Sequence, residues 1–229
     1  MKLSVIIPCF NEQDTVAVIL DRVKNEKTIE KEIIVVDDSS TDNSRKILEN
    51  YKKDNEIKLI LNDQNKGKGY SVKQGLKEAT GDIILIQDAD LEYSPSDYNN
   101  LIEPILNNHA DVVYGSRFKG GQETRVLYFW HTIGNKFLTL FSNIFTDLNL
   151  SDMEVGYKAF RTDVLKSINL KENRFGFEPE ITAKISKKSL RLYEVGISYF
   201  GRKYNEGKKI TWKDGFSAIR CIIKYNLFK

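Results

Sequence analysis

Short apolar runs alternate with helix-period segments along the first half of the chain. The runs are rich in Val, Ile and Leu and span residues 3–7, 33–36, 57–61 and 83–86. Between the first two, Val16, Ile19, Leu20 and Val23 follow the i, i+3, i+4, i+7 spacing of one helix face. Parallel strands need such crossovers to return, so the pattern predicts an α/β fold with a mostly parallel, doubly wound sheet.

The second half of the chain is less regular. Ser94 and Pro95 predict the start of a helix whose apolar stripe is Tyr98, Leu101, Ile102 and Ile105. A short strand follows at 112–114. We then expect an aromatic-rich helix at 132–146, a strand at 155–160, a helix at 178–187 and an amphipathic helix from residue 212. No linker or repeat interrupts the sequence, which predicts one domain over 1–229 with an irregular second half.

Composition fits an ordinary globular protein, with 41% hydrophobic and 29% charged residues. Cys9 and Cys221 follow no metal-ligand spacing, which fits a reducing compartment, and we expect a cytoplasmic protein. The apolar stretch after Lys2 is stopped by Pro8, so no signal peptide is expected. Polar residues interrupt the apolar stretch 126–145, which argues against a membrane-spanning helix.

Positive charge gathers at the C-terminus. Residues 201–229 hold eight Lys or Arg against two acids and so carry +6, while the net charge of the chain is +3. This asymmetry favours an anionic partner, either phosphates or an acidic membrane surface, although a solvated basic helix explains it equally well.

Acidic and amide side chains follow three of the predicted strands. Asn11 and Glu12 follow the first, Asp37 and Asp38 the second, and Asp88 and Asp90 the fourth. Carboxylates gathered in one crevice raise one another's pKa unless a cation or hydrogen-bond donors neutralise them. Mg²⁺ or Mn²⁺ bound together with substrate phosphates would do so, and the spacing therefore predicts a metal and a diphosphate. Taken singly, each acid could instead mark a solvated strand end or a helix N-cap.

The stretch "NKGKGYS" resembles a phosphate loop without matching one. Neither G-x-x-x-x-G-K-[ST] nor G-x-G-x-x-G occurs where a P-loop hydrolase or a dinucleotide-binding dehydrogenase needs it. Gly67 and Gly69 permit a tight entry to the next helix, while Lys66 and Lys68 can reach an anion.

Five segments, "SVIIPCFNE", "EIIVVDDSSTD", "NKGKG", "GDIILIQDADLEY" and "YGSRF", resemble the family 2 nucleotide-sugar glycosyltransferases with the A-type fold. Within that family the chain resembles the dolichyl-phosphate mannose and polyprenyl-phosphate glucose synthases, over about residues 3–210. The resemblance implies a nucleotide-sugar-binding half (1–117), an acceptor-binding half (118–210) and a basic C-terminal helix (211–229).

The resemblance also assigns site residues. It implies that Pro8, Phe10, Glu12 and Asp38 hold the nucleoside. Asp88, Asp90 and Glu92 would carry Mg²⁺ or Mn²⁺, and Arg117 would face phosphates. With the other strand-end and loop residues, the predicted donor site comprises Pro8, Phe10, Asn11, Glu12, Asp37, Asp38, Lys68, Asp88, Ala89 and Asp90.

In the second half, "SDMEVGYKAFR" resembles the family segment that places Asp152 beside the acceptor, with Val155 in place of the usual hydroxyl residue. "GRKYNEGKKI" resembles the loop that closes over the substrates, with Arg202, Gly207 and Lys209 matching and Lys208 at the Ser position. An Arg of the family has its counterpart in His131 or Arg125. "FGFEPEI" would place Glu178 and Glu180 near the acceptor, unless they only begin a helix.

The resemblance implies an inverting, metal-dependent transfer of a hexose from GDP-mannose or UDP-glucose to a polyprenyl or dolichyl phosphate, with no nucleic-acid partner. An anionic lipid phosphate needs no general base, and Arg117, Arg202 and Lys209 would position it. A saccharide hydroxyl acceptor would need Asp152 as the base. A sugar-nucleotide pyrophosphorylase and a non-catalytic nucleotide-binding module are the alternatives from other classes.

The expected location of the protein in the cell depends on what the C-terminal helix contacts. Its stripe of Trp212, Phe216, Ile219 and Ile223 could lie on an anionic membrane, at the inner face of the cytoplasmic membrane, or pack on the protein's own sheet.

Overall fold

The computed structural model describes residues 1–126, 128–202 and 212–228, with the side chains of Trp212 and Lys213 excepted. The predictions for Gly207, Lys208 and Lys209 lie outside these residues. Within them, no helix combines the length and the apolar character needed to cross a bilayer.

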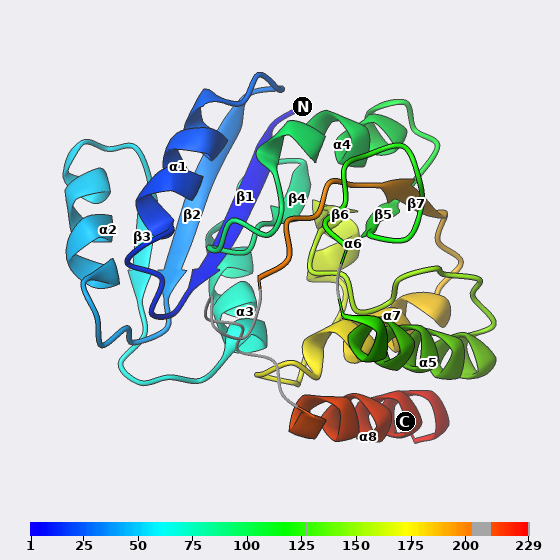
Figure 1. The fold of residues 1–229 in the computed structure, drawn as a ribbon. Helices are drawn as coiled ribbons and strands as arrows, with labels where there is room; N and C mark the ends of the chain where they lie inside the picture. The colour runs from blue at the N-terminus through cyan, green and yellow to red at the C-terminus, as the bar shows by residue number, and fades with distance from the viewer. Residues whose placement is uncertain (127, 203–211, 229) are drawn as a thin grey trace.

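One sheet of seven strands runs through the described chain (Figure 1). In the order β3-β2-β1-β4-β6-β5-β7, its strands are β3 (Lys58–Leu61), β2 (Lys31–Asp37), β1 (Leu3–Cys9), β4 (Ile83–Ile86), β6 (Lys158–Arg161), β5 (Val112–Ser116) and β7 (Leu192–Gly196). Neighbouring strands are parallel except β6, which is antiparallel to both β4 and β5. The predicted mostly parallel α/β sheet is therefore confirmed.

Strand order fixes where a ligand can bind. The chain moves from β1 outward to β2 and β3, then returns to β4 on the other side of β1. A crevice forms at such a reversal, outside the carboxyl ends of the strands. The segments after β1, β2 and β4 therefore meet at one edge of the sheet.

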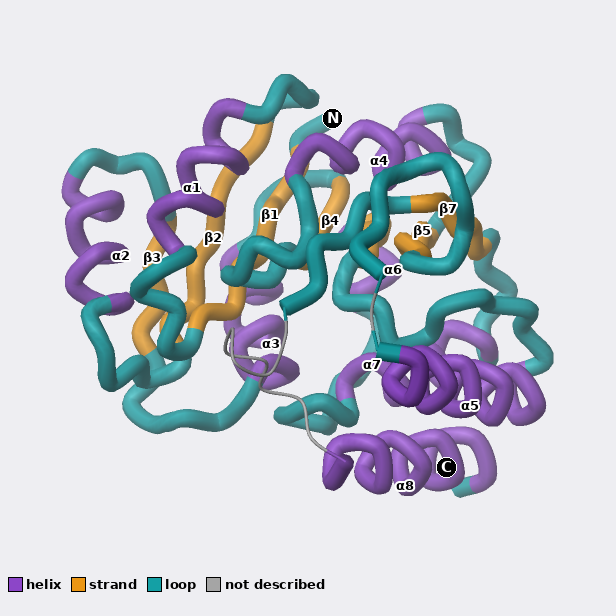
Figure 2. Tube along the Cα trace, in the orientation of Figure 1, coloured by secondary structure: helices purple, strands orange, loops and turns teal. Residues whose placement is uncertain are grey.

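Eight α-helices are described around this sheet (Figure 2). They are α1 (Val16–Asn25), α2 (Ser44–Lys53), α3 (Lys68–Glu78), α4 (Tyr98–Leu106), α5 (Phe129–Thr146), α6 (Thr162–Lys166), α7 (Phe177–Ser186) and α8 (Trp212–Leu227). Helix α3 packs against β1 and β2, and α4 against β5 and β6, while α5, α7 and α8 pack against one another.

The predicted apolar stripes form the core. Val16, Ile19, Leu20 and Val23 of α1 are buried, as are all four residues of β4. Tyr98, Leu101, Ile102 and Ile105 are buried on α4, and the Ser94 hydroxyl accepts a hydrogen bond from the Ser96 amide in the 3₁₀ turn that precedes it. Burial of each large apolar side chain contributes about 1.5–3 kcal/mol.

Several boundaries differ from the prediction. Strand β7 and helix α6 were not expected. Strand β7 is a half-exposed edge strand with little apolar alternation, and α6 has only five residues. Helix α2 begins at Ser44, with Asn43 at the cap position, so Asp37 and Asp38 are not its N-caps.

The face that helix α8 buries is not the apolar stripe predicted from the sequence. Its buried residues include Ala218, Cys221 and Ile222, which face α7 and α5 rather than the sheet. Phe216, a member of the predicted stripe, is 67% exposed. The alternative that this stripe packs on the protein's own sheet is therefore wrong.

Candidate functional site

Acids from two strand ends converge on one guanidinium. Arg202 places Nη1 3.3 Å from Glu12 Oε2 after β1, and Nη2 2.6 Å from Asp90 Oδ2 after β4. Its Nε lies 3.4 Å from Glu92 Oε1. Burial opposes the charge of Arg202, but Asp90, Glu12 and Glu92 outweigh it and raise the pKa of the guanidinium. Glu12 and Asp90, which were predicted to share one crevice, therefore meet at Arg202, together with Glu92.

Negative charge at Asp90 remains poorly compensated. The side chain is only 15% exposed. Burial, reinforced by Asp88 and Glu92, raises the pKa of Asp90 to about 7 even with Arg202 in contact. Additional positive charge beside Asp90 would therefore be bound favourably, and a hard divalent cation fits this donor set.

A second buried cation joins the two halves of the chain. Lys68, the first residue of α3, places Nζ 2.8 Å from Asp88 Oδ1 and 3.1 Å from Glu178 Oε1. Burial opposes its charge, yet Asp88 and Glu178 raise the pKa of Lys68. Lys68 therefore brings Glu178 of α7 to Asp88, and its role toward a nucleotide stays a prediction.

Gly156 allows the acceptor-side segment to approach Asp88. A Cβ atom at this position would overlap Asp88 Oδ2 and lie 3.1 Å from Lys68 Nζ. No larger residue fits here unless one of these two side chains moves. The glycine of "SDMEVGYKAFR" therefore sets the distance between that segment and the end of β4.

The two acids after β2 organise loops. Asp37 is fully buried and paired with Arg45, whose Nη2 lies 2.9 Å from Asp37 Oδ2. Asp38 accepts hydrogen bonds from the Gly67 amide at 2.6 Å, the Lys66 amide at 3.0 Å and the Asn62 side chain at 2.7 Å. Asp38 thus holds the "NKGKG" loop beside the crevice, and its role toward a nucleoside stays a prediction.

The remaining predicted donor-site residues line the same edge. Asn11 adopts a positive φ of 51° and accepts a hydrogen bond from the Thr41 amide at 2.8 Å. The Ala89 carbonyl accepts one from Thr15 Oγ1 at 3.1 Å. Pro8 and Phe10 are half-buried at and just after the end of β1. All three segments therefore meet where the topology predicts.

Arg117 and Asp152 are bound to each other. Two parallel hydrogen bonds of 2.7 Å join Nε to Oδ2 and Nη2 to Oδ1, and Asp152 is fully buried. The guanidinium also lies over the ring of Tyr199. In this geometry both oxygens of Asp152 accept hydrogen bonds from Arg117, and the two charges neutralise each other. Their predicted catalytic roles are therefore not supported by this arrangement.

Glu92 is likewise bound by other groups of the protein. It accepts hydrogen bonds from the Tyr199 hydroxyl and from the Arg202 amide, both at 2.9 Å. Among the described residues, no three His, Cys, Asp or Glu side chains form a group that could hold a metal ion. The predicted trio of Asp88, Asp90 and Glu92 is thus not assembled, because Lys68 pairs with Asp88 and the 199–202 segment binds Glu92.

Arg125 and His131, the two basic residues expected near the acceptor, lie in different parts of the fold. Arg125 donates a hydrogen bond to the Gly201 carbonyl at 2.9 Å and therefore adjoins the segment that carries Arg202. His131 lies on α5, within 3.5 Å of Asn135 on the next turn of the helix.

Glu180, which was expected near the acceptor, accepts hydrogen bonds from the amides of Lys171 and Glu172, both at 2.7 Å, and so stabilises a loop.

Sequence reasoning missed Glu154. Its Oε1 and Glu178 Oε2 are buried side-chain oxygens without a hydrogen-bond partner in the described part of the protein. Burial and the neighbouring Glu178 raise the pKa of Glu154 to about 8. Burial also lowers the pKa of Lys158 to about 8, although Glu178 favours its charge. The signal in the sequence is an acid that stands between two apolar residues, Met153 and Val155.

The chain is similar to known glycosyltransferases in both sequence and fold. The family model described as Glycosyl transferase family 2 matches residues 4–168. A dolichol-phosphate mannosyltransferase of Pyrococcus furiosus is 31% identical over the whole chain, which spans 64% of the length of that relative. The UDP-N-acetylglucosamine–dolichyl-phosphate N-acetylglucosaminyltransferase of Methanococcus voltae is 28% identical over 98% of this chain and 96% of its own length.

Solved structures share the fold at low identity. Glucosyl-3-phosphoglycerate synthase from Mycobacterium tuberculosis, in complex with Mn²⁺, UDP and glucosyl-3-phosphoglycerate, superposes with a TM-score of 0.77 at 18% identity. The alignment covers 98% of this chain and 80% of that one. A complex of the same enzyme with Mg²⁺ and UDP gives a TM-score of 0.74 at 17% identity, over 98% and 79% of the two chains. These likenesses confirm the expected A-type fold.

Proposed function

Because this chain belongs to glycosyl transferase family 2, we propose that it transfers a hexose from a nucleotide sugar to a polyprenyl phosphate, with inversion at the anomeric carbon. Two relatives named for transfer to dolichol phosphate support the lipid acceptor. GDP-mannose and UDP-glucose are the donors to test first. Membership in this family sets aside the pyrophosphorylase and the non-catalytic module.

The observation that carries the proposal is the meeting of Glu12, Asp90 and Arg202 at the edge of the sheet where the strand order reverses between β1 and β4. Asp88 and Asp90 are the residues that would hold a divalent cation, with the remaining ligands supplied by the donor. The ion would neutralise the charge that develops on the departing nucleoside diphosphate. Mn²⁺ or Mg²⁺ in the structural neighbours supports this assignment.

The chain's own residues then have distinct tasks. Asp38 holds the "NKGKG" loop against the donor side of the crevice. Lys68 compensates Asp88 and Glu178 at the junction of the two halves. Arg202 compensates Glu12, Asp90 and Glu92, and it is the described cation best placed to turn toward a diphosphate.

The state of Asp152 favours a lipid-phosphate acceptor over a saccharide hydroxyl. A phosphate oxygen is already anionic and attacks without a base, whereas a hydroxyl must lose a proton. Both oxygens of Asp152 are held by Arg117. A saccharide acceptor would instead need Glu154, whose buried Oε1 and raised pKa of about 8 make it the second candidate for a base.

Transfer of radiolabelled sugar from each donor to a polyprenyl phosphate in detergent tests the proposal. We expect the product to form with Mn²⁺ or Mg²⁺, to be lost on chelation, and to carry the inverted anomeric configuration by NMR. Asp90→Asn should lower the rate by at least about 100-fold, in line with losing a group that stabilises the leaving charge. Asp63→Asn, at an exposed acid after β3, is the matched control. Transfer only to soluble saccharides would refute the lipid acceptor.

A further inference from the structure

Helix α5 packs Leu138, Phe141 and Phe145 against the core but exposes a second apolar face. Its outward side chains are large and apolar: Phe129, Trp130, Ile133, Phe137, Leu140 and Ile144 are between 43% and 78% exposed. Its buried residues are polar, namely Thr139, Ser142 and Thr146. At about 100° per residue, the six exposed residues fall within an arc of about 100°, opposite the three buried ones. These six exposed residues define the apolar face of α5.

The inward side of α5 is bound to the acceptor-side segment. The Thr139 hydroxyl accepts a hydrogen bond from the Met153 amide at 3.1 Å, one residue from Asp152. The Asn143 side chain donates to the Leu150 carbonyl at 2.8 Å and accepts from the Leu150 amide at 3.2 Å. Lys136 lies over the ring of Phe118, which follows Arg117. Whatever covers the apolar face is therefore adjacent to the place where an acceptor is expected.

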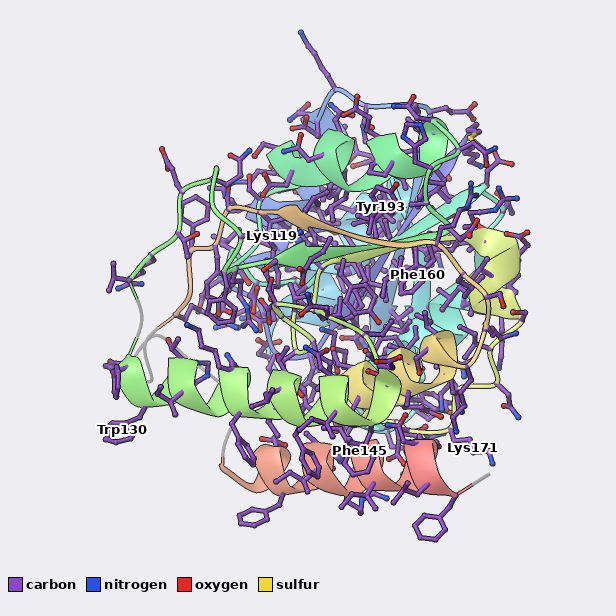
Figure 3. All side chains as sticks on the ribbon, turned by 90° about the vertical axis from the view of Figure 1, so that its right-hand side faces the viewer. Lys119, Trp130, Phe145, Phe160, Lys171 and Tyr193 are labelled. Carbon is purple, nitrogen blue, oxygen red and sulfur yellow. The ribbon has the colours of Figure 1, made fainter. Side chains whose placement is uncertain are left out.

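The charge around the face fits an anionic surface. Residues 126–146 contain Lys136 and no Asp or Glu. Helix α8 lies alongside α5 (Figures 1 and 3), and its residues 212–227 include three Lys or Arg against one Asp. Arg220 and Lys224 of α8 are partly neutralised by Glu172, at 2.9 and 3.0 Å. Acidic headgroups would meet little repulsion here.

The shape of the face fits a bilayer. An 18-residue helix is about 27 Å long and can lie flat at the boundary between headgroups and acyl chains. Tyr128, Phe129 and Trp130 gather at its N-terminal end, and aromatic side chains favour that boundary. Trp130 projects away from the sheet at this end of α5 (Figure 3).

We propose that the apolar face of α5 docks on the surface of a bilayer that contains anionic lipid, and so brings the acceptor-side segment to a membrane-borne substrate. The proposal deepens the proposed function and rests on it for the nature of the acceptor. Docking itself involves neither the metal nor the donor, and it can be measured without them.

Co-sedimentation with vesicles is the first test. We expect the protein to bind vesicles of phosphatidylcholine with phosphatidylglycerol more tightly than phosphatidylcholine alone. Phe137→Gln, Leu140→Gln and Ile144→Gln together should weaken binding by about tenfold or more, because less apolar surface enters the interface. Val18→Gln with Leu106→Gln, at exposed positions of α1 and α4, is the matched control. Equal binding by the triple variant and the control would overturn the proposal.

Trp130 fluorescence is the second test. In a Trp212→Phe background Trp130 is the chain's single tryptophan. Its emission should shift to shorter wavelength on adding the mixed vesicles, and lipids brominated in the acyl chain should quench it. Emission that is already shielded from iodide without vesicles, together with a dimer in sedimentation velocity that the triple variant dissociates, would assign the face to a second copy and overturn the proposal.

Activity separates docking from chemistry. The triple variant should lose transfer to a long-chain acceptor in vesicles and retain transfer to a short-chain, water-soluble polyprenyl phosphate. Wild-type protein that binds vesicles but transfers sugar to neither acceptor would contradict the proposed function and leave docking in place. Thermal unfolding of the triple variant should match the wild type, since all three side chains are more than half exposed.

Discussion

Asp90 links binding to stability at the scale of a single residue. Its pKa of about 7 in the folded protein lies well above the value of about 3.9 for an exposed aspartate. The folded state therefore holds this proton more tightly than the unfolded chain does. Between about pH 4 and pH 7 the free energy of unfolding should fall as the pH rises, because the carboxylate must ionise in a site that disfavours the charge.

Asp90→Asn should remove this cost. We expect the variant to be more stable than the wild type at pH 8 by an amount on the order of 2–4 kcal/mol, and nearly equal to it at pH 4, because Asn stands in for the protonated form. Urea unfolding at both pH values measures the difference. Asp63→Asn should give no such crossover, and a variant that is less stable at pH 8 would contradict the assigned environment. Gained stability with lost transfer would identify Asp90 as a functional rather than a structural residue.

At the Arg117–Asp152 pair, replacing the acid should lower the free energy of unfolding rather than raise it. Both groups are buried, and Asp152, although burial opposes the charge, raises the pKa of Arg117. Asp152→Asn strands a buried guanidinium, and we expect a loss of about 3–5 kcal/mol in the free energy of unfolding. Asp163→Asn, which breaks an exposed pair with Arg161, should cost less than about 1 kcal/mol. If Asp152 were chiefly a catalytic base, its variant would lose activity and keep its stability.

At the scale of elements, the sequence predicts strands and helices where periodicity reflects burial. The stripes of α1 and α4 and the apolar run of β4 lie in the core, because the same side chains that give the period are those removed from water. Strand β7 lies at the edge of the sheet with half-exposed side chains, so its sequence carries little of that signal.

Pairing inside the site could not be predicted from the sequence. The strand order explains why Glu12 and Asp90 meet, but not that Arg202, more than 100 residues later, lies between them. Spacing along the chain also places Asp88, Asp90 and Glu92 on one strand end, whereas their partners belong to α3 and to the 199–202 segment. Ion pairs between distant segments depend on tertiary packing, which periodicity does not encode.

Helix α5 also shows what periodicity cannot predict, namely which face of a helix is buried. Its apolar period is strong, and a water-soluble fold would turn that face inward. The structure turns it outward and buries Thr139, Ser142 and Thr146, whose hydroxyls are small enough to pack closely; that of Thr139 holds the acceptor-side segment. The sequence predicts an aromatic-rich helix here, while only the structure shows which of its faces is exposed.

At the scale of the whole molecule, the two halves share one crevice. The donor-side residues Asp88 and Asp90 face Lys68 and Arg202, while Gly156 brings the acceptor-side segment against Asp88. A nucleoside diphosphate bound with a divalent cation would add the positive charge that Asp90 lacks and would leave Arg202 free to contact phosphate. Ligand and cation should therefore stabilise the fold together more than the sum of their separate effects.

A thermal-shift titration checks this coupling. At about 100 times the dissociation constant a ligand of the folded state adds about 2.7 kcal/mol, which in a chain of 229 residues raises the midpoint by about 5–10 °C. We expect that shift with GDP or UDP in the presence of Mn²⁺, and less than half of it with either component alone. Asp88→Asn should abolish the dependence on Mn²⁺, whereas Asp63→Asn should preserve it. A full shift with nucleotide alone would mean that Lys68 and Arg202 supply all the positive charge that the diphosphate needs, and that the site works without a metal.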